Sequence, residues 1–488
     1  MTHVDFAKLW RVDRRTRRPA VSHDKPLQVM RWLPVTVAAV LVVLLGSALS
    51  MWLLGVWAPI PGRVSNPDQL RLDRIKTGLT VAAGLAAGVT LLMTLRRQTW
   101  SERAQRFAES DALEQRTTAL YVAAATQLGS DKAAVRLAGL YALERLGQDN
   151  PKLRQTVVDV WCAYLRMPYT PPAEFVLRNA EHYANPPPAE AEPPELPAES
   201  ERRQELQVRL AAQRLLATHL RAPAAPASSN TYWLDAMSNR MVIDLVGAVL
   251  VDFTLEACDV GRADFSRAEF PSDVSLRGTH FHGYVQLSGA RFHGNANLTR
   301  AEFHNEADLS WTVFHSDINL GGAVFHTDAN LTGSQSHGYA MLSEARFRGN
   351  ANLNGMQFHG YANLRATRFN ARADLSSAHF YGYADLQHAE FHGGGDLSRA
   401  QFHGDADLSG TQFHAVVDMW AALFHGSANL AEAHFGPYAR LADAKATRRA
   451  SLPQGWILLP MGPDGDELRL VARDSRQSPQ IDDAEPSG

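Results

Sequence analysis

Histidine is the residue type in this chain whose spacing most suggests chemistry, because it follows phenylalanine at a regular interval. If one coil of chain holds 22 residues, these positions form two ladders on opposite faces. The first ladder contains an uninterrupted run of His293, His315, His337 and His359. The second contains His282, His304 and His326, then Arg348 and Asn370, then His392 and His414. Adjacent imidazoles could share a metal ion or respond together to pH.

The straightness of such a ladder limits its use as a metal site. Its rungs are collinear, whereas the ligands of an ion must surround it, so a ladder offers two ligands comfortably and a third poorly. We therefore expect no metal and no cofactor, and the weak metal candidates are His293, His315, His337 and His359. The alternative interpretation is a row of exposed polar side chains.

Other chemistry has little support in the sequence. There is no Ser/His/Asp constellation, no phosphate-binding Gly loop and no zinc-type Cys cluster, so we expect no enzyme, no catalytic residue and no small-molecule substrate. The two cysteines, Cys162 and Cys258, lie far apart and indicate a reducing compartment rather than a disulfide framework. Cys258 falls at a position that should be small and buried.

The histidines are positioned by a repeat of eleven residues that runs from about Leu245 to Leu441. Its unit is F-H-G-x-A-[ND]-L-S-x-A-x, as in the stretch that begins at Phe292 and restarts at Phe303. Large apolar residues alternate at steps of five and six, which fits neither a helical face nor a long alternating strand. A coil of short extended segments does fit, with a small residue and then Leu or Phe pointing inward from each segment.

This stretch resembles the pentapeptide-repeat family. The likeness is carried by repeated A-[DN]-L triplets, at Ala351–Leu353, Ala362–Leu364, Ala373–Leu375, Ala384–Leu386 and Ala406–Leu408. The resemblance implies four segments per coil and a right-handed quadrilateral β-helix, mainly β in class. The steps are a plain five up to Phe270, and every second step thereafter is six, which predicts about nine coils stacked at roughly 4.8 Å.

An Asn/Asp ladder precedes the leucines, and its second half is acidic. Its members are Asn297, Asp308, Asn319, Asn330, Asp374, Asp385, Asp396, Asp407 and Asp418. Such a stripe resembles the soluble family members that imitate duplex DNA and protect topoisomerases. Arginines such as Arg346, Arg365 and Arg372 lie on the same rod, however, and the net charge of the chain is only −3. We therefore expect no nucleic-acid partner and keep the DNA mimic as an alternative.

The N-terminal region indicates a membrane anchor. Residues 1–32 form a basic segment, and residues 33–95 predict a transmembrane hairpin with uncharged spans at 33–60 and 77–95. Gly84 and Gly88 form a GxxxG motif through which the two helices could approach closely. Eight basic residues precede the first span and four follow the second within about ten residues, which places both termini on the cytoplasmic side of the cell membrane.

The remaining segments connect or close the solenoid. Residues 96–168 predict a helical adaptor, with one helix over 101–128, a second capped by Ser130 and a third starting at Asn150-Pro151. This adaptor resembles the segment before the solenoid in membrane-anchored pentapeptide-repeat proteins, through Gln127–Lys132, Val135–Leu137 and Tyr141–Arg145. The other expected segments are a Pro-rich linker with one helix from Ser200 (169–230), the solenoid (231–452), a hairpin cap (453–473) and a disordered tail (474–488).

These features together predict a non-catalytic, membrane-anchored β-solenoid that acts as a scaffold for an unknown protein partner. Two alternatives remain open at this point. One is a topoisomerase-directed DNA mimic, and the other is a metal- or pH-responsive surface formed by the histidine ladders. The oligomeric state and the partner's identity are not encoded in any pattern that we recognise.

Overall fold

The computed structural model describes residues 32–53, 67–175, 197–222, 232–233, 240–436, 439–440, 444–446, 450–452, 456–461 and 467–472. The chain divides into two compact units, Met1–Gln115 and Arg116–Gly488. The basic segment before Trp32, most of the Pro-rich linker and the C-terminal tail lie outside the described residues.

Two helices dominate the N-terminal unit, α1 (Trp32–Leu53) and α2 (Pro67–Leu128). α2 is continuous and contains both the predicted span at 77–95 and the predicted polar helix at 101–128. No proline or glycine lies between Leu95 and Ser101 to interrupt the backbone hydrogen bonds. As expected, the helix ends just before Gly129.

The contact between α1 and α2 does not use the GxxxG motif. A Cβ added at Gly46 of α1 would lie 2.7 Å from Leu85 Cδ1 of α2, and Gly78 of α2 is buried next to Met51. Gly84 and Gly88 have nothing within 4 Å of their Cβ positions. The contact face therefore follows Gly78 and Leu85, which are seven residues apart on the helix.

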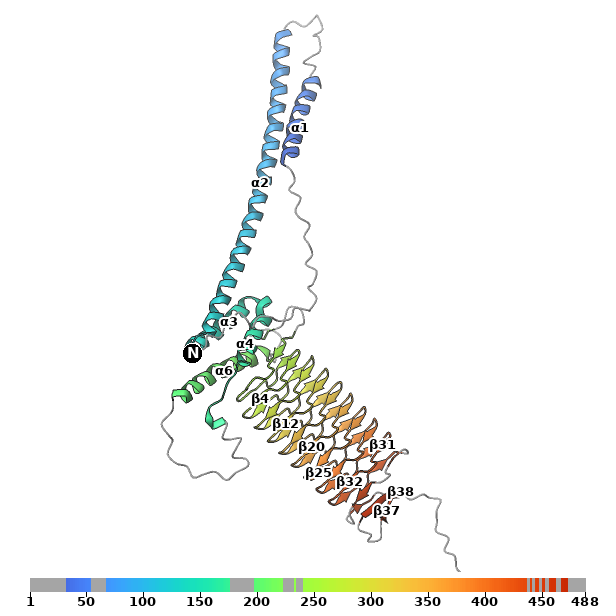
Figure 1. Cartoon of the computed structure of the whole chain (residues 1–488). Helices are drawn as coiled ribbons and strands as arrows, with labels where there is room; N and C mark the ends of the chain where they lie inside the picture. The colour runs from blue at the N-terminus through green and yellow to red at the C-terminus, as the bar shows by residue number, and fades with distance from the viewer. Residues whose placement is uncertain are drawn as a thin grey trace, which may run out of the picture. The chain divides into compact units, whose positions relative to one another are not determined.

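The second unit is a parallel β-solenoid whose strands form four sheets (Figure 1). Two sheets carry the Phe positions. Phe face 1 contains β2 (Asp259–Val260), β6 (His280–Phe281), β10 (Glu302–Phe303), β14 (Val324–Phe325), β18 (Arg346–Phe347), β22 (Arg368–Phe369), β26 (Glu390–Phe391), β30 (Gln412–Phe413) and β34 (His434–Phe435). Phe face 2 contains β4 (Glu269–Phe270), β8 (Arg291–Phe292), β12 (Val313–Phe314), β16 (Gln335–Ser336), β20 (Gln357–Phe358), β24 (His379–Phe380), β28 (Gln401–Phe402), β32 (Leu423–Phe424) and β35 (Lys445–Ala446).

The other two sheets carry the Asn/Asp positions. Asx face 1 contains β1 (Ile243–Asp244), β3 (Ala263–Asp264), β7 (Val285–Gln286), β11 (Ala307–Asp308), β15 (Ala329–Asn330), β19 (Ala351–Asn352), β23 (Ala373–Asp374), β27 (Gly395–Asp396) and β31 (Val417–Asp418). Asx face 2 contains β5 (Val274–Ser275), β9 (Ala296–Asn297), β13 (Ile318–Asn319), β17 (Ala340–Met341), β21 (Ala362–Asn363), β25 (Ala384–Asp385), β29 (Ala406–Asp407), β33 (Ala428–Asn429) and β36 (Ala450–Ser451).

The strand register follows the change of period seen in the sequence. Val249 pairs with Glu269, Asp259 with His280 and Ala307 with Ala329, so a coil lengthens from 20 to 21 to 22 residues. Three of the sheets contain nine strands each, which confirms a solenoid of about nine turns. Each two-residue strand turns one side chain in and one out, because successive side chains alternate.

The interior is filled by stacked phenylalanines and leucines. On Phe face 1 the rings of Phe281, Phe303 and Phe325 stack with centroids 5.2 and 4.5 Å apart, and this stack continues up the rod. On Phe face 2 the equivalent stack stops at Ser336, which is fully buried between Phe314 and Phe358. The inward assignment of the Leu and Phe positions is therefore confirmed, and Cys258 is buried as predicted.

The first coil is covered by helices of the same unit, α3 (Ala133–Asp149), η2 (Pro151–Leu153), α4 (Arg154–Leu165) and α6 (Pro197–Leu220). Two of the predicted starts differ from those observed. α3 begins after Lys132, and Ser130 Oγ instead accepts a hydrogen bond from the Lys132 N–H. Pro151 begins a 3-10 turn before α4, and α6 begins at Pro197, three residues before Ser200.

The helices and the solenoid share one core. The rings of Trp233, Trp161 of α4 and His219 of α6 contact one another. Their centroids are 5.5 Å apart for Trp233 and Trp161, 3.9 Å for Trp233 and His219, and 6.0 Å for Trp161 and His219. Gln155 completes the edge of the first coil, because its side-chain amide donates to Val242 O and accepts from Val242 N, both at 2.9 Å. At the other end, β37 (Trp456–Met461) pairs antiparallel with β38 (Glu467–Ala472), which pairs with β35. The turn expected at Gly462–Gly465 lies outside the described residues.

Candidate functional site: the outward ladders of the solenoid

The structure places each histidine that follows an inward-facing residue on the outside of the rod. Phe303 points inward, so Glu302 before it and His304 after it both point outward from the same face. The register of 22 residues then places His304 between His282 and His326 of the neighbouring coils. Because the backbone fixes both the spacing and the direction, rows of side chains form without any further packing.

The ladder that we named from the sequence is an aromatic stack on Phe face 2. The ring centroids of His293 and His315 are 4.8 Å apart, those of His315 and His337 5.5 Å, and those of His337 and His359 4.6 Å. The stack continues through Tyr381, His403 and His425, at 4.7, 4.7 and 5.1 Å. The sequence analysis stopped this row at His359 because it followed histidine alone, and a tyrosine ring continues the stack equally well.

Burial favours the neutral form of three of these imidazoles, because it lowers the pKa of His293, His315 and His359. Burial lowers the pKa of His293, and Arg291 lowers it further, although Glu269 acts in the opposite direction. Burial also lowers the pKa of His315 and of His359, and repulsion from His337 adds to both shifts. A neutral ladder can accept metal, but parallel rings direct their in-plane nitrogen lone pairs side by side rather than toward one point. This run therefore does not present convergent ligands.

Three possible metal ligands lie close together on Phe face 1 instead. His280 Nδ1, a Glu302 carboxylate oxygen and His304 Nε2 lie within 4.8 Å of one another, the one such group of three among the described residues. His326 Nε2 is 3.6 Å from the same Glu302 oxygen, Oε2. His280 and Glu302 each come before a Phe, so the pattern of histidines that follow Phe does not include this group. The paired strands β6 and β10 bring these two residues together.

The side chains of the Asn/Asp ladder form hydrogen bonds to the backbone at the corners of the coil. In each corner the side-chain oxygen accepts the backbone N–H two residues later, as Asn297 does from Thr299 at 3.0 Å and Asp308 from Ser310 at 3.0 Å. The same contact recurs in Asp374, Asp396 and Asp407. Such Asx turns stabilise a change of chain direction. Arg372 also forms ion pairs with Asp374 and Asp396, so the acidic half of the ladder is partly neutralised.

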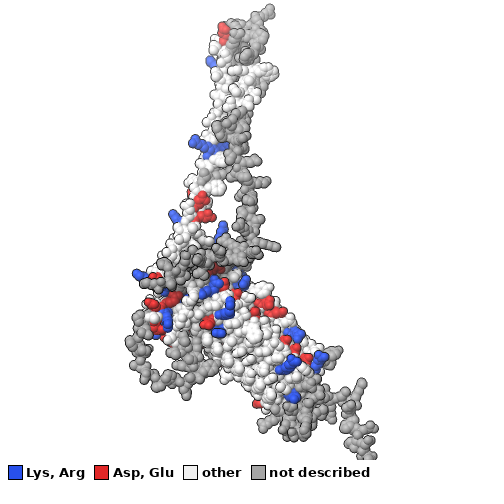
Figure 2. Space-filling view, in the orientation of Figure 1, with Lys and Arg blue, Asp and Glu red and all other residues white. Residues whose placement is uncertain are grey.

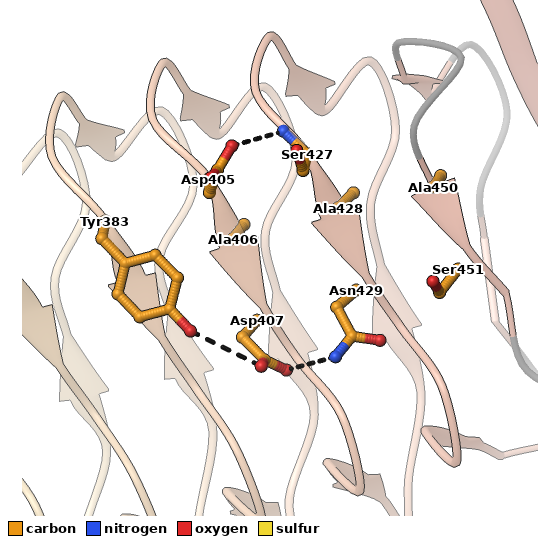
Figure 3. Close-up of a pocket in the computed structure, with 9 residues that line it drawn as sticks. All are labelled: Tyr383, Asp405, Ala406, Asp407, Ser427, Ala428, Asn429, Ala450 and Ser451. Carbon is orange, nitrogen blue, oxygen red and sulfur yellow. Dashed lines mark hydrogen bonds between the residues drawn. The ribbon is translucent and has the colours of Figure 1, made fainter.

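A shallow hollow lies on Asx face 2 near the C-terminal end of the rod (Figure 3). Asp407 lies at its centre and accepts hydrogen bonds from Asn429 Nδ2 at 3.1 Å and Tyr383 Oη at 3.5 Å. Burial alone would raise the pKa of Asp407, but hydrogen bonds from Ser409, Gln387 and Asn429 bring it below its usual value. The central carboxylate of the hollow is thus bound by neighbouring side chains.

The charges on the visible face are mixed in sign (Figure 2). Acidic and basic side chains lie together toward both ends of the visible solenoid surface, with an uncharged area between these groups. Pairs such as Arg368–Glu390, with N and O 3.2 Å apart, contribute to this pattern. A continuous acidic face comparable to a DNA duplex is therefore absent from the described residues on this side.

Comparison with known sequences agrees with this geometry. The family model for pentapeptide repeats in nine copies matches residues 287–335, 342–390, 375–423 and 397–445. Residues 287–335 and 342–445 of the solenoid therefore match the pentapeptide-repeat family model, as the A-[DN]-L triplets in this region predicted. No curated protein matches the chain.

Proposed function

We propose that this chain is a non-catalytic, membrane-anchored scaffold whose right-handed pentapeptide-repeat solenoid binds a protein partner on the cytoplasmic side. The observation that carries the anchor is the exposure of large apolar side chains on α1 and α2. They include Leu41, Leu44 and Leu45 of α1 and Leu79 and Leu91 of α2. Isolated exposed apolar residues are ordinary, but a contiguous apolar surface calls for a membrane or a partner.

Length and composition support a spanning segment in α2. Among the described residues it is the one helix, at Ile75–Leu128, that is long and apolar enough to cross a membrane. α1 is uncharged throughout its 22 residues and packs along α2 at Gly46 and Leu85. A helix of this length rises about 33 Å, which matches the hydrocarbon core. We therefore propose two spans, at 33–60 and 77–95, with both termini cytoplasmic by the distribution of basic residues.

The binding role of the solenoid rests on its surface. Its repeating polar groups, such as Asn297 and Asp308, stabilise the corners of the coil. This structural role accounts for them without a bound substrate. Exposed aromatic residues remain on the faces, with Tyr339 and Tyr383 in one column on Asx face 2 and Trp311 at a corner of Asx face 1. Aromatic side chains are enriched in protein interfaces, which favours a protein partner. The mixed charge disfavours the alternative of a topoisomerase-directed DNA mimic.

Thiol labelling on intact cells tests the topology. The native Cys162 and Cys258 are both buried, so background labelling should be low. We expect Ser65→Cys, in the loop between the spans, to react with a membrane-impermeant maleimide on intact cells. We expect Arg300→Cys, on an exposed corner of the solenoid, to react only after lysis. Labelling of Arg300→Cys from outside would overturn the orientation. Recovery of the chain in a carbonate-washed soluble fraction would overturn the anchor.

A further inference from the structure

The side chains on two coils of Phe face 1 converge in a way that the repeat does not require. His280 and Glu302 are paired residues of β6 and β10, and His304 lies two residues beyond Glu302 on the same outward face. Four coils further along, the equivalent strand repeats the Glu-Phe-His sequence at Glu390, Phe391 and His392. There Arg368 takes the place of His280. The Glu-Phe-His motif is the same on both strands, and only the residue that pairs with its glutamate on the neighbouring coil differs.

The distances in the first group are close to those of a metal site. Glu302 Oε2 is 3.6 Å from His280 Nδ1 and 3.5 Å from His304 Nε2. Ligand atoms about 2.0–2.1 Å from a tetrahedral Zn²⁺ lie roughly 3.3 Å from one another. The two separations exceed this edge by a few tenths of an ångström. The rings of His280 and His304 are also nearly parallel, with 16° between their planes and centroids 6.1 Å apart, so the side chains must rotate to direct both lone pairs toward one ion. The third separation, between the two imidazole nitrogens, is within 4.8 Å and must also shorten.

The surrounding side chains fix the orientation of the central ligand. The ring of His304 is stacked between His282 and His326, with centroids 4.8 and 4.4 Å away. His282 Nε2 is 3.2 Å from Asp259 Oδ1, which holds the adjacent ring in place. Supporting contacts of this kind orient the ligands of natural metal sites.

His326 lies beside this group, and its contacts limit how it can take part in binding a metal. Its Nε2 is buried and makes no hydrogen bond, although it is 3.6 Å from Glu302 Oε2. Its Nδ1 is 3.2 Å from Arg348 Nη1, which can only donate. That contact favours the tautomer with a proton on Nε2, so His326 cannot ligate through Nε2 while the contact persists. The guanidinium also places a positive charge beside the group.

We propose that His280, Glu302 and His304 form a binding site for a divalent transition-metal ion, with water in the remaining coordination positions. Two imidazoles and one carboxylate are a donor set that Zn²⁺ accepts with an open position. The same set also suits Fe²⁺, Co²⁺ and Ni²⁺, so the site is defined by its ligands rather than by one metal. The site is independent of the membrane anchor and of the protein partner proposed above.

Zinc calorimetry on the tag-free, full-length protein in detergent at pH 7.5 tests the proposal. We expect one Zn²⁺ per chain, and a loss of affinity of about 100-fold or more in the Glu302→Gln, His304→Gln double variant, because removing two ligands exceeds the effect of removing a supporting contact. His392→Gln is the matched control, since it alters the same motif beside Arg368. His315→Gln with His337→Gln tests the other ladder. Both controls should bind zinc as the parent protein does.

Two further measurements keep the result independent of folding. Arg348→Gln should tighten zinc binding several-fold, because it frees His326 Nδ1 and removes a nearby positive charge. Co²⁺ added in place of Zn²⁺ should produce visible d–d absorption that the double variant lacks and both controls keep. The proposal is overturned if the parent protein does not bind zinc, if the double variant binds it unchanged, or if binding is lost in the His315, His337 variant instead.

Discussion

At the scale of single residues, the two glycine positions of the repeat are occupied by glycine for different structural reasons. Gly355 adopts a φ of +65° at the corner after Leu353, and a Cβ there would meet nothing within 4 Å. Gly360, which follows the His position, has ordinary φ, but a Cβ there would lie 2.4 Å from Gly338 O on the preceding coil. The first glycine is favoured by backbone conformation, and the second is needed because two coils approach closely.

This difference predicts that two alanine substitutions, five positions apart, lower the free energy of unfolding by unequal amounts. Gly355→Ala should cost about 1 kcal/mol, the strain of a left-handed residue, and the chain already tolerates this strain at Arg300 and Glu344. Gly360→Ala should cost roughly 3 kcal/mol, because backbone atoms of adjacent coils must separate. Urea unfolding followed by circular dichroism measures both. Equal costs would mean that the coils are less closely packed at Gly360 than the structure shows.

Two adjacent residues, the outward-facing Asn363 and the inward-facing Leu364, give a second residue-scale test. Leu364 is fully buried, whereas Asn363 points outward and accepts the Arg365 N–H at 3.0 Å. Leu364→Asp should destabilise the solenoid by several kcal/mol, because it buries a charge without a partner. Asn363→Asp retains the acceptor for the corner, so its unfolding midpoint should stay close to that of the parent. Similar losses in both variants would contradict the alternation of side chains on this strand.

At the scale of elements, the Phe stack of face 2 contains one interruption. Ser336 is buried between Phe314 and Phe358, and its hydroxyl donates to Gly338 O at 3.3 Å. Ser336→Phe should restore the continuous stack and raise the free energy of unfolding by about 1–3 kcal/mol, the value of burying an aromatic side chain. Thermal unfolding of the parent and the variant measures this change. A lower midpoint in the variant would show that the neighbouring coils have already closed over the serine.

The histidine ladder predicts a dependence of stability on pH. Burial lowers the pKa values of His293, His315 and His359 in the folded protein, and His337 and Arg291 add to this by repulsion, while Glu269 opposes it at His293. The unfolded chain, with a histidine pKa of about 6.5, therefore binds more protons than the folded chain near that pH. Stability is then complete above about pH 7.5 and falls as the pH drops through about 6.5.

Urea midpoints at pH 8, 7 and 6, at constant ionic strength, measure this slope. The parent protein should lose stability across the interval, and a His315→Gln, His359→Gln double variant should lose less, because two of the shifted groups are gone. A double variant with the same slope as the parent would show that other groups cause the pH dependence.

The elements also show what the sequence could and could not predict. The inward positions of Phe303 and Leu364 followed from the period, because a coil of short extended segments brings steps of five and six to a common axis, and neither a helix nor a long strand does. The corner role of Asn297 was not foreseen, since an Asx contact depends on local backbone geometry. The pairing of His280 with Glu302 depends on which residues precede Phe on adjacent coils, and a pattern read only after Phe cannot find it. Asn150 and Pro151 begin the helical turn before α4 as the sequence predicted, whereas the start of α6 was placed at Ser200 instead of Pro197, because proline begins a helical turn as readily as a capping side chain does.

At the scale of the whole molecule, the stack of coils needs a closed end. Each coil contacts only its neighbours, so the stability of such an array is close to a sum of coil and interface terms. The helical segment closes the first coil through Trp233, Gln155 and Cys258, whose Sγ is 3.5 Å from Ala217 O of α6. An open coil would expose unpaired backbone groups to other chains. The cap therefore protects the rod from pairing end to end.

Substituting the central tryptophan of this cap tests its contribution to the whole rod. Trp233 is fully buried, and a Cβ at Gly147 would lie 2.5 Å from its ring, so α3 packs directly on it. Trp233→Ala should cost about 3–5 kcal/mol by creating a cavity, and the chain should then self-associate as the first coil opens. Trp311→Ala is the control, because Trp311 is 67% exposed and its loss should change the unfolding free energy by less than about 0.5 kcal/mol. Urea unfolding and light scattering measure the two effects. If Trp233→Ala unfolds like Trp311→Ala and stays dispersed, the helices cover the solenoid without stabilising it.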